Sequence, residues 1–248
     1  MSESRTGAIV LDIIEAWKQL VEKHGITQQE YWDAVKFIVA AVEQGEGYLL
    51  PDAFLEAIVV RNQEASQQGT LSQILGPYHV EDAPILPDGK LAADDEPGER
   101  LTVRGIVRGV DGKPLSDAVV DFWQADAEGR YSNFDPAVKK GALRGKIRTP
   151  SDGQYQLHTI VPAPYMIPHK GPTGRVLESI GRHPWRPAHI HLIASHEGHR
   201  TLTTQIYFDG DQYLDSDSVR GATRDLAYPL ESAPGGKTVD FDIELESA

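Results

Sequence analysis

The sequence contains no cysteine and only two methionines in 248 residues. Without cysteine there can be no disulfide, thiolate zinc site, iron–sulfur cluster or cysteine nucleophile, so a metal must be bound by His, Tyr, Asp or Glu. Basic residues are outnumbered 24 to 37, which argues against nucleic-acid binding because such binding depends on basic patches. The chain also lacks a signal-peptide pattern and any run of about 20 apolar residues, so we expect a cytoplasmic protein without a membrane span.

The first quarter of the sequence has the periodicity of helices. Apolar residues recur at helical spacing over residues 9–21, which predicts a first helix. Thr27 and Glu30 have the spacing of a capping box, and an apolar stripe then continues to Val42, which predicts a second. Pro51 is suited to the first turn of a third helix.

After Gly69 the pattern changes to short apolar runs separated by turn dipeptides, which is typical of strands. The clearest predicted strands span residues 102–110, 118–126, 155–160, 189–195, 202–208 and 239–245. We therefore expect a mainly β fold, an antiparallel β-sandwich preceded by a helical segment, with domains at 1–68 and 69–248. The connection from Pro162 to Pro187 is unusually long and rich in Pro and Gly, which favours a functional or disordered loop.

His189 and His191 are the most distinctive local feature. Residues two apart on a strand point to the same face, about 6.5 to 7 Å apart, so both imidazoles can converge on one metal ion. A carboxylate from Glu197 or Asp209 would complete a ferrous two-His, one-carboxylate site. Tyrosine phenolates are the other option, because they are hard anionic donors suited to ferric iron.

Two tyrosines stand in constrained surroundings, Tyr131 after the strand that ends near Asp126 and Tyr165 between prolines. Three segments that contain these tyrosines and histidines, residues 121–131, 160–165 and 181–191 with 202–205, resemble the signature blocks of the intradiol ring-cleavage dioxygenases, the catechol 1,2-dioxygenase family. The resemblance extends over nearly the whole chain and includes the lead-in Ile74-Leu-Gly-Pro-Tyr-His-Val-Glu-Asp-Ala-Pro84.

The resemblance implies an activity and a set of site residues. Tyr131, Tyr165, His189 and His191 would hold a non-haem ferric ion, Fe(III), together with a hydroxide. Tyr165 would accept a proton from a chelating aromatic diol. Arg186 would stabilise charge that develops on the ring as O2 attacks, and Gln205 would orient the groups around the metal. The product would be a cis,cis-muconate.

Within this family, the end of the helical part and the lead-in form the substrate wall. Here the wall would be made of Leu49, Asp52, Ala53, Ile74, Gly76, Pro77 and Tyr78. The apolar members suit catechol or a chlorocatechol, whereas Asp52 could accept a hydrogen bond from the extra hydroxyl of hydroxyquinol, whose cleavage gives maleylacetate. The family resemblance also implies a homodimer formed through the N-terminal helices, with a phospholipid between the subunits. The alternative from another class is a non-catalytic β-sandwich binding module in which the histidines are structural.

Overall fold

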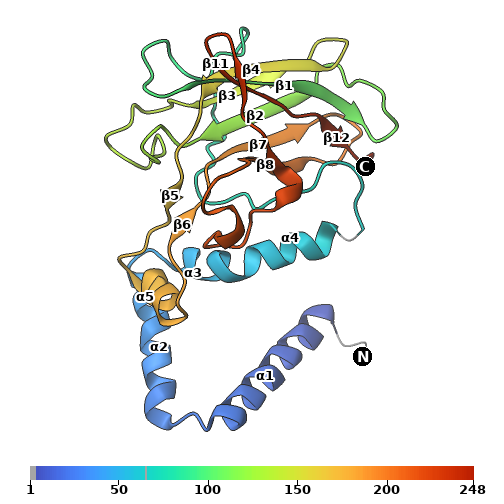
Figure 1. Ribbon diagram of the computed structural model, residues 1–248. Coiled ribbons are helices and arrows are strands. Elements are labelled where there is room, and N and C mark those ends of the chain that lie inside the picture. Colours follow the sequence, from blue (N-terminus) through green and yellow to red (C-terminus); the bar gives the residue numbers. More distant parts are fainter. Residues whose placement is uncertain (1–3, 65) are drawn as a thin grey trace. The chain divides into compact units, whose positions relative to one another are not determined.

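The computed structural model describes residues 4–64 and 66–248 (Figure 1). The chain divides into two compact units, residues 1–47 and 48–248. Among the described residues, no helix combines the length and apolar character needed to cross a membrane.

The first unit consists of the two helices predicted at the start of the chain, α1 (Arg5–His24) and α2 (Gln28–Glu43). Ser4 caps α1 by accepting a hydrogen bond from a backbone N–H of the first turn. Thr27 and Glu30 form the predicted capping box at the start of α2, which confirms this prediction.

The third predicted helix belongs to the second unit and is divided in three. Its parts are α3 (Leu49–Pro51), the π-helical turn η1 (Asp52–Glu56) and α4 (Ala57–Glu64). The π turn was not foreseen, because such turns have no clear sequence signal, although they are frequent at functional sites. The side chain of Arg61 donates a 3.0 Å hydrogen bond to the carbonyl of Arg220, so this helix is tied to the loops of the β-rich part. The division into domains at 1–68 and 69–248 stays a prediction.

Two five-stranded sheets form the centre of the second unit (Figure 1). The first contains β10 (Glu231–Ala233), β11 (Gly236–Asp240), β1 (Arg100–Gly109), β12 (Ile243–Leu245) and β4 (Gln154–Ile160). The second contains β3 (Arg144–Arg148), β2 (Val119–Gln124), β7 (His189–Ser195), β8 (Leu202–Phe208) and β9 (Ala227–Tyr228). Val103 and Leu157 of the first sheet share one buried core with Phe122 and Ile206 of the second, so the mainly β fold with N-terminal helices is confirmed.

The sheets are mixed, which differs from the expected antiparallel arrangement. Strand β1 pairs in parallel with β11 and β12, and β8 pairs in parallel with β9. The C-terminal part of the chain returns beside β1 in the same direction, and a pattern of alternating residues does not reveal the direction of a partner strand. Strand β3 was also missed because its sequence, Arg-Gly-Lys-Ile-Arg, is dominated by charge.

The predicted strand at 239–245 is broken into β11 and β12. The break falls at Phe241 and Asp242, whose backbone and side chain make specific contacts with neighbouring strands. The Phe241 carbonyl accepts a 2.6 Å hydrogen bond from the Tyr155 hydroxyl, and an Asp242 carboxylate oxygen accepts one of 3.0 Å from the Ile106 N–H. A side-chain acceptor therefore replaces a regular ladder bond at this point.

Gly105 on β1 allows the close approach of this break. A Cβ atom at position 105 would lie 2.0 Å from the carbonyl oxygen of Phe241, which Tyr155 holds in place. We expect Gly105→Ala to lower the free energy of unfolding by about 1–3 kcal/mol or more, because the backbone must shift to relieve the overlap. Urea denaturation followed by circular dichroism measures this loss, and an unchanged midpoint would show that the break can move freely.

The long connection at 162–187 contains regular structure rather than an open loop. It holds β5 (Tyr165–Met166), α5 (Pro172–Ser179) and β6 (Trp185–Arg186). Strands β5 and β6 pair so that Tyr165 lies opposite Arg186. The connection thereby brings two of the predicted site residues together. Further short helical turns follow at η2 (Leu214–Ser216) and η3 (Arg224–Leu226).

Candidate active site

Two buried histidines on β7 form the base of the candidate site. His189 and His191 alternate with apolar residues, so their rings lie on one face of the sheet. Their Nε2 atoms are 3.0 Å apart. The Nδ1 atom of His189 donates a 2.7 Å hydrogen bond to the Pro187 carbonyl, which leaves the lone pair on Nε2. The predicted histidine pair therefore has ring nitrogens that face a common point.

Both imidazoles are neutral at ordinary pH. Burial, followed by the nearby Arg186 guanidinium, lowers the pKa of His189 to about 3. Burial and the neighbouring His189 lower the pKa of His191 well below its usual value. The His191 ring stacks on Trp123 with 4.7 Å between ring centroids, and its Nδ1 has no hydrogen-bond partner among the described residues. A neutral imidazole is the form that binds a metal.

Tyr131 is placed by a tight turn that follows β2. The carboxylate of Asp126 accepts 2.9 Å hydrogen bonds from the backbone N–H groups of Glu128 and Arg130 and so closes the turn. Gly129 has a φ of +79°, and a Cβ there would approach the Pro164 carbonyl to 2.8 Å. The turn holds the Tyr131 hydroxyl 3.5 Å from Nε2 of His189.

Tyr165 reaches the same group of buried rings from β5. Its ring meets that of Tyr131 edge to face at 5.3 Å, and its centroid lies 5.6 Å from that of His189. Burial raises the pKa of both tyrosines, and the nearby Arg186 guanidinium offsets this only in part, so both are neutral phenols in the metal-free protein. A bound multivalent cation would reverse this preference, because it supplies the charge that a buried phenolate needs.

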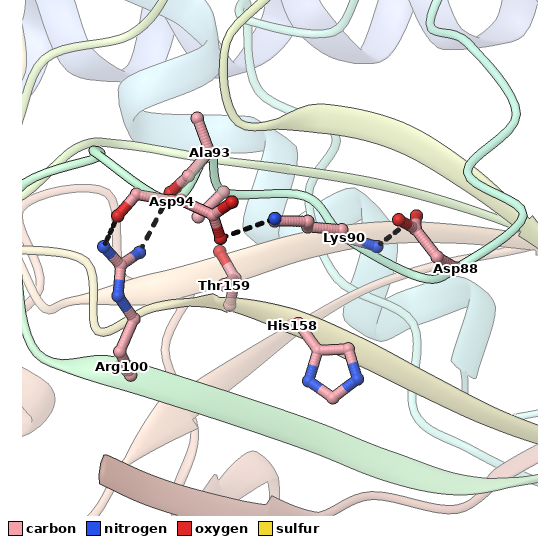
Figure 2. A pocket seen from close by; sticks show the side chains of 8 residues that line it. Asp88, Lys90, Ala93, Asp94, Arg100, His158 and Thr159 are labelled. Carbon is pink, nitrogen blue, oxygen red and sulfur yellow. Dashed lines mark hydrogen bonds and ion pairs between the residues drawn. The ribbon is translucent and has the colours of Figure 1, made fainter. Parts of the chain in front are cut away.

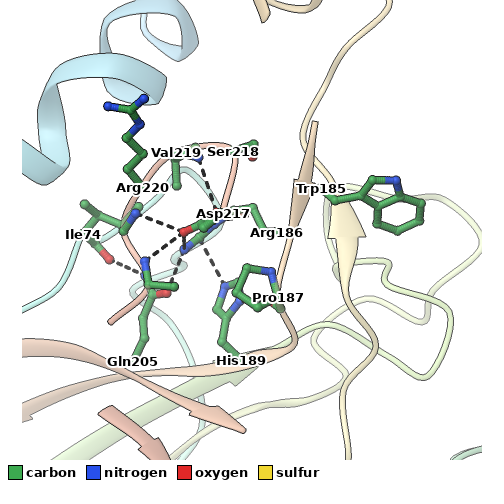
Figure 3. Close-up of polar contacts among 12 residues, drawn as sticks. Ile74, Trp185, Arg186, Pro187, His189, Gln205, Asp217, Ser218, Val219 and Arg220 are labelled. Atoms are coloured by element: carbon green, nitrogen blue, oxygen red, sulfur yellow. Dashed lines mark hydrogen bonds and ion pairs between the residues drawn. The ribbon is translucent and has the colours of Figure 1, made fainter. Parts of the chain in front are cut away.

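The guanidinium of Arg186 lies beside the histidines and is fully buried (Figure 3). Its Nη1 is 3.3 Å from Nε2 of His189, and its Nη2 donates to the Gln205 side-chain oxygen at 3.1 Å. Nε and Nη2 donate to the two carboxylate oxygens of Asp217 at 3.1 and 3.2 Å. The Tyr207 hydroxyl donates to the same Gln205 oxygen at 2.6 Å. Arg186 is therefore fixed from several sides.

Asp217 and Gln205 in turn are held by the backbone. Burial alone would raise the pKa of Asp217, but the Arg186 guanidinium and the Ala222 N–H keep it below its usual range. The Gln205 amide nitrogen donates a 2.7 Å hydrogen bond to the Ile74 carbonyl (Figure 3). The lead-in segment is thereby joined to the Arg186 network.

The predicted wall residues differ in how they relate to the tyrosines. Ala53 and Ile74 are buried in the same apolar cluster as Tyr131 and Tyr165. Tyr78 packs against that cluster and stacks on Tyr131 with 4.3 Å between centroids. A Cβ on Gly76 would lie 3.5 Å from Cε1 of His191. Of the remaining wall residues, Leu49 and Asp52 are half-buried and Pro77 is exposed.

Three charged residues of the site were not predicted, namely Glu56, Arg144 and Asp217. Asp217 lies 31 residues from its partner Arg186, so no local motif reveals the pair. Glu56 on the π turn accepts a 3.2 Å hydrogen bond from the Leu75 N–H, and burial and the nearby Asp52 raise its pKa. In the sequence, a glutamate on a helix such as Glu56 is expected to be an exposed surface charge. Its partial burial comes from the lead-in segment, whose Leu75 N–H it binds.

The two-His, one-carboxylate alternative finds no support. Glu197 and Asp209 are exposed, whereas both histidines are buried. Over residues 4–64 and 66–248, no three His, Asp or Glu side chains gather in a way that could hold a metal ion.

A polar pocket of 360 Å³ lies elsewhere, beside β1 and β4 (Figure 2). Lys90 forms an ion pair with Asp94 there, and its backbone N–H donates to Asp88. The Arg100 guanidinium donates to the carbonyls of Ala93 and Asp94. Because these groups satisfy one another, the pocket offers no converging set of reactive groups.

Comparisons with known proteins agree with the fold and show the family. The family model described as "Dioxygenase" matches residues 74–247, and the one described as "Catechol dioxygenase N terminus" matches residues 3–70. The chain is 38% identical to the chlorocatechol 1,2-dioxygenase of Rhodococcus opacus, covering 99% of each chain. It is 35% identical to the 6-chlorohydroxyquinol 1,2-dioxygenase of Cupriavidus pinatubonensis, covering 98% of this chain and 91% of the relative.

The solved structures give the same result. The crystal structure of 3-chlorocatechol 1,2-dioxygenase from Rhodococcus opacus 1CP matches with a TM-score of 0.93 over 100% of both chains, at 38% identity. A ring-cleaving dioxygenase is thus the class that fold and site define. The chain belongs to the intradiol dioxygenase family and is an enzyme of the catechol 1,2-dioxygenase type. Membership in an enzyme family argues against the alternative of a non-catalytic binding module.

Proposed function

We propose that Tyr131, Tyr165, His189 and His191 hold a non-haem ferric ion. The observation that carries this proposal is the pair of neutral imidazoles whose Nε2 atoms are 3.0 Å apart beside two buried phenols. Two nitrogens bound at about 2.1 Å to adjacent positions of one ion lie about 3 Å apart, so the separation fits a shared metal. Two hard phenolate donors favour a trivalent ion over a softer divalent one.

When bound, the ferric ion would supply a Lewis-acidic centre for the two hydroxyl oxygens of the aromatic diol and so would allow the ring to react with O2. As a metal-bound phenolate, Tyr165 would be the base that accepts a proton from a diol hydroxyl, and its side chain is buried next to Arg186 and His189. Arg186 stabilises negative charge on the attacked ring, and Gln205 holds its guanidinium in place. The four side chains are buried, which would keep water away from the charged ring.

We infer that the substrate is catechol or a chlorocatechol, cleaved between its two hydroxyls to a cis,cis-muconate. The buried apolar side chains of Ala53 and Ile74 beside the tyrosines support this choice. So does the similarity to a chlorocatechol 1,2-dioxygenase over the full chain. Asp52 favours the alternative, hydroxyquinol cleaved to maleylacetate, because its half-buried carboxylate could accept a third hydroxyl.

Iron analysis and oxygen uptake test this proposal. We expect one iron per chain, a burgundy colour from phenolate-to-iron charge transfer, and loss of both with a strong ferric chelator. We expect kcat/KM for hydroxyquinol to be at least about tenfold below that for catechol or 3-chlorocatechol, since a third hydroxyl enters a largely apolar wall. A colourless iron-loaded protein would contradict the tyrosine ligands, and a preference for hydroxyquinol would assign the third hydroxyl to Asp52.

We also propose a homodimer formed through the N-terminal helices, with a phospholipid held between the subunits, in a cytoplasmic enzyme. The exposed apolar side chains of Val10, Ile13, Ile14 and Trp17 on α1 support the helical interface.

A further inference from the structure

A second buried guanidinium belongs to β3, which pairs with β2 in the sheet that also contains the histidine strand β7. Arg144 is only 4% exposed. Its Nε donates to the Ser132 hydroxyl at 2.8 Å and its Nη2 to the Ser132 carbonyl at 2.9 Å. Its Nη1 donates to the Tyr78 carbonyl at 2.5 Å. The guanidinium thus uses all three of its nitrogens on neutral oxygens.

In contrast to Arg186, Arg144 has no carboxylate at ion-pair distance in the part of the chain that the structure describes. Among the described residues Arg186 forms a buried ion pair with Asp217, whereas Arg144 forms no salt bridge. The carboxylate on the adjoining part of the sheet, Asp121, is already contacted by His79 at 3.1 Å and Lys146 at 3.5 Å. An arginine stays charged even when buried, and a buried charge without a counter-ion is costly. The Asp121 carboxylate and the Phe134 ring, whose centroid is 5.7 Å from the guanidinium carbon, therefore offset the burial of this cation only in part, and a closer anion would stabilise it.

Tyr131 is the group placed to become that anion. Arg144 donates hydrogen bonds to the hydroxyl and the carbonyl oxygen of Ser132, the residue that follows Tyr131 in the chain. It also donates a hydrogen bond to the carbonyl of Tyr78. The Tyr78 ring stacks on the Tyr131 ring, with 4.3 Å between the ring centroids and 17° between the ring planes. The phenol of Tyr131 is neutral in its metal-free surroundings, and it would carry a negative charge as a ligand of a trivalent ion.

We propose that Arg144 is a positioning residue for the metal site: it clamps the turn that carries Tyr131 and supplies the positive charge that balances the Tyr131 phenolate. This inference rests on the proposed function, because it needs Tyr131 to bind the ferric ion as a phenolate. It predicts that Arg144 acts on metal affinity and on the electronic state of the ligand, without contact with the diol.

Arg144→Met removes both the positive charge and the hydrogen bonds to Ser132 and Tyr78, whereas Arg144→Lys keeps the charge and loses part of the hydrogen bonding. Arg148→Met on the same strand is the matched control. The side chain of Arg148 is exposed and, among the described residues, contacts the carbonyl and carboxylate of Asp117. We expect Arg144→Met to weaken Fe(III) affinity about 10- to 100-fold, measured by competition with a ferric chelator. We expect its visible charge-transfer band to move to longer wavelength, because loss of the nearby cation raises the energy of the phenolate electrons. Arg148→Met should leave affinity and band unchanged.

Arg144→Lys keeps the charge but cannot reach three oxygens at once. We expect this variant to melt at a lower temperature while its band stays at the wild-type wavelength. A folded Arg144→Met with wild-type affinity and band overturns the proposal. If Arg144→Met fails to fold, a band in Arg144→Lys that moves to longer wavelength overturns the charge-balancing role. If the wild-type chain itself gives no coloured iron complex, it is the proposed metal site that fails, which is a distinguishable result.

Discussion

Replacing Tyr165 with phenylalanine is expected to lower kcat by about 10²- to 10⁴-fold, the usual contribution of a positioned acid or base. The substitution keeps the buried ring, which packs with Tyr131 and His189, and removes only the hydroxyl. A diol would then lack its proton acceptor, and the ferric ion would lose one of two phenolates. Oxygen uptake at saturating catechol measures kcat, and the visible spectrum should lose a large part of its intensity.

Tyr155→Phe is the matched control for this experiment. Tyr155 is also buried, but its hydroxyl donates to the Phe241 carbonyl in the sandwich core. Its loss should lower thermal stability through one missing hydrogen bond, about 0.5–1.5 kcal/mol, and leave colour and kcat intact. Full activity in Tyr165→Phe, or an equal loss of activity in both variants, would remove Tyr165 from its proposed role.

Much of the fold could be predicted from the sequence, because the periodicity of apolar residues and the capping residues indicate helices and strands locally. The Thr27–Glu30 capping box and the alternation over 189–195 each lie within a few residues, and both were predicted at the observed positions. The direction of β11 and β12 beside β1 depends on partners more than 130 residues away, so no local pattern contains it. The same holds for the π turn, which arises where a helix meets the lead-in.

The residues of the candidate site likewise fall into those that the local sequence indicates and those that only distant contacts reveal. The spacing of His189 and His191 on one strand face is enough to propose them as a pair, whereas Tyr131 and Tyr165 are proposed through the resemblance of their segments to the intradiol dioxygenases. Asp217 and Arg144 carry no such signal, since each is defined by what it contacts in space. Side chains that hold the functional groups in place are less visible in the sequence than the functional groups themselves.

The pair of Asp217 and Arg186 gives the second large expected effect. Asp217→Asn is expected to lower the free energy of unfolding by about 3–5 kcal/mol, because it leaves the buried Arg186 charge without a partner. The carboxylate also accepts hydrogen bonds from the N–H groups of Gly221 and Ala222 at 3.0 and 2.9 Å, and a single amide oxygen cannot serve all of these donors. Denaturation by urea measures the loss, with Asp240→Asn as the control.

Asp240 pairs with Arg104 on the surface, where both side chains are more than half exposed, so its removal should cost less than about 1 kcal/mol. Arg186 holds the pKa of Asp217 below its usual range, which means that the pair stabilises the fold above the unfolded carboxylate pKa of about 4. That stabilisation is lost as the pH falls through the lower, folded pKa. The difference between wild type and Asp217→Asn should therefore shrink in acid, and a difference that grows there would mean that Asp217 is protonated in the native protein.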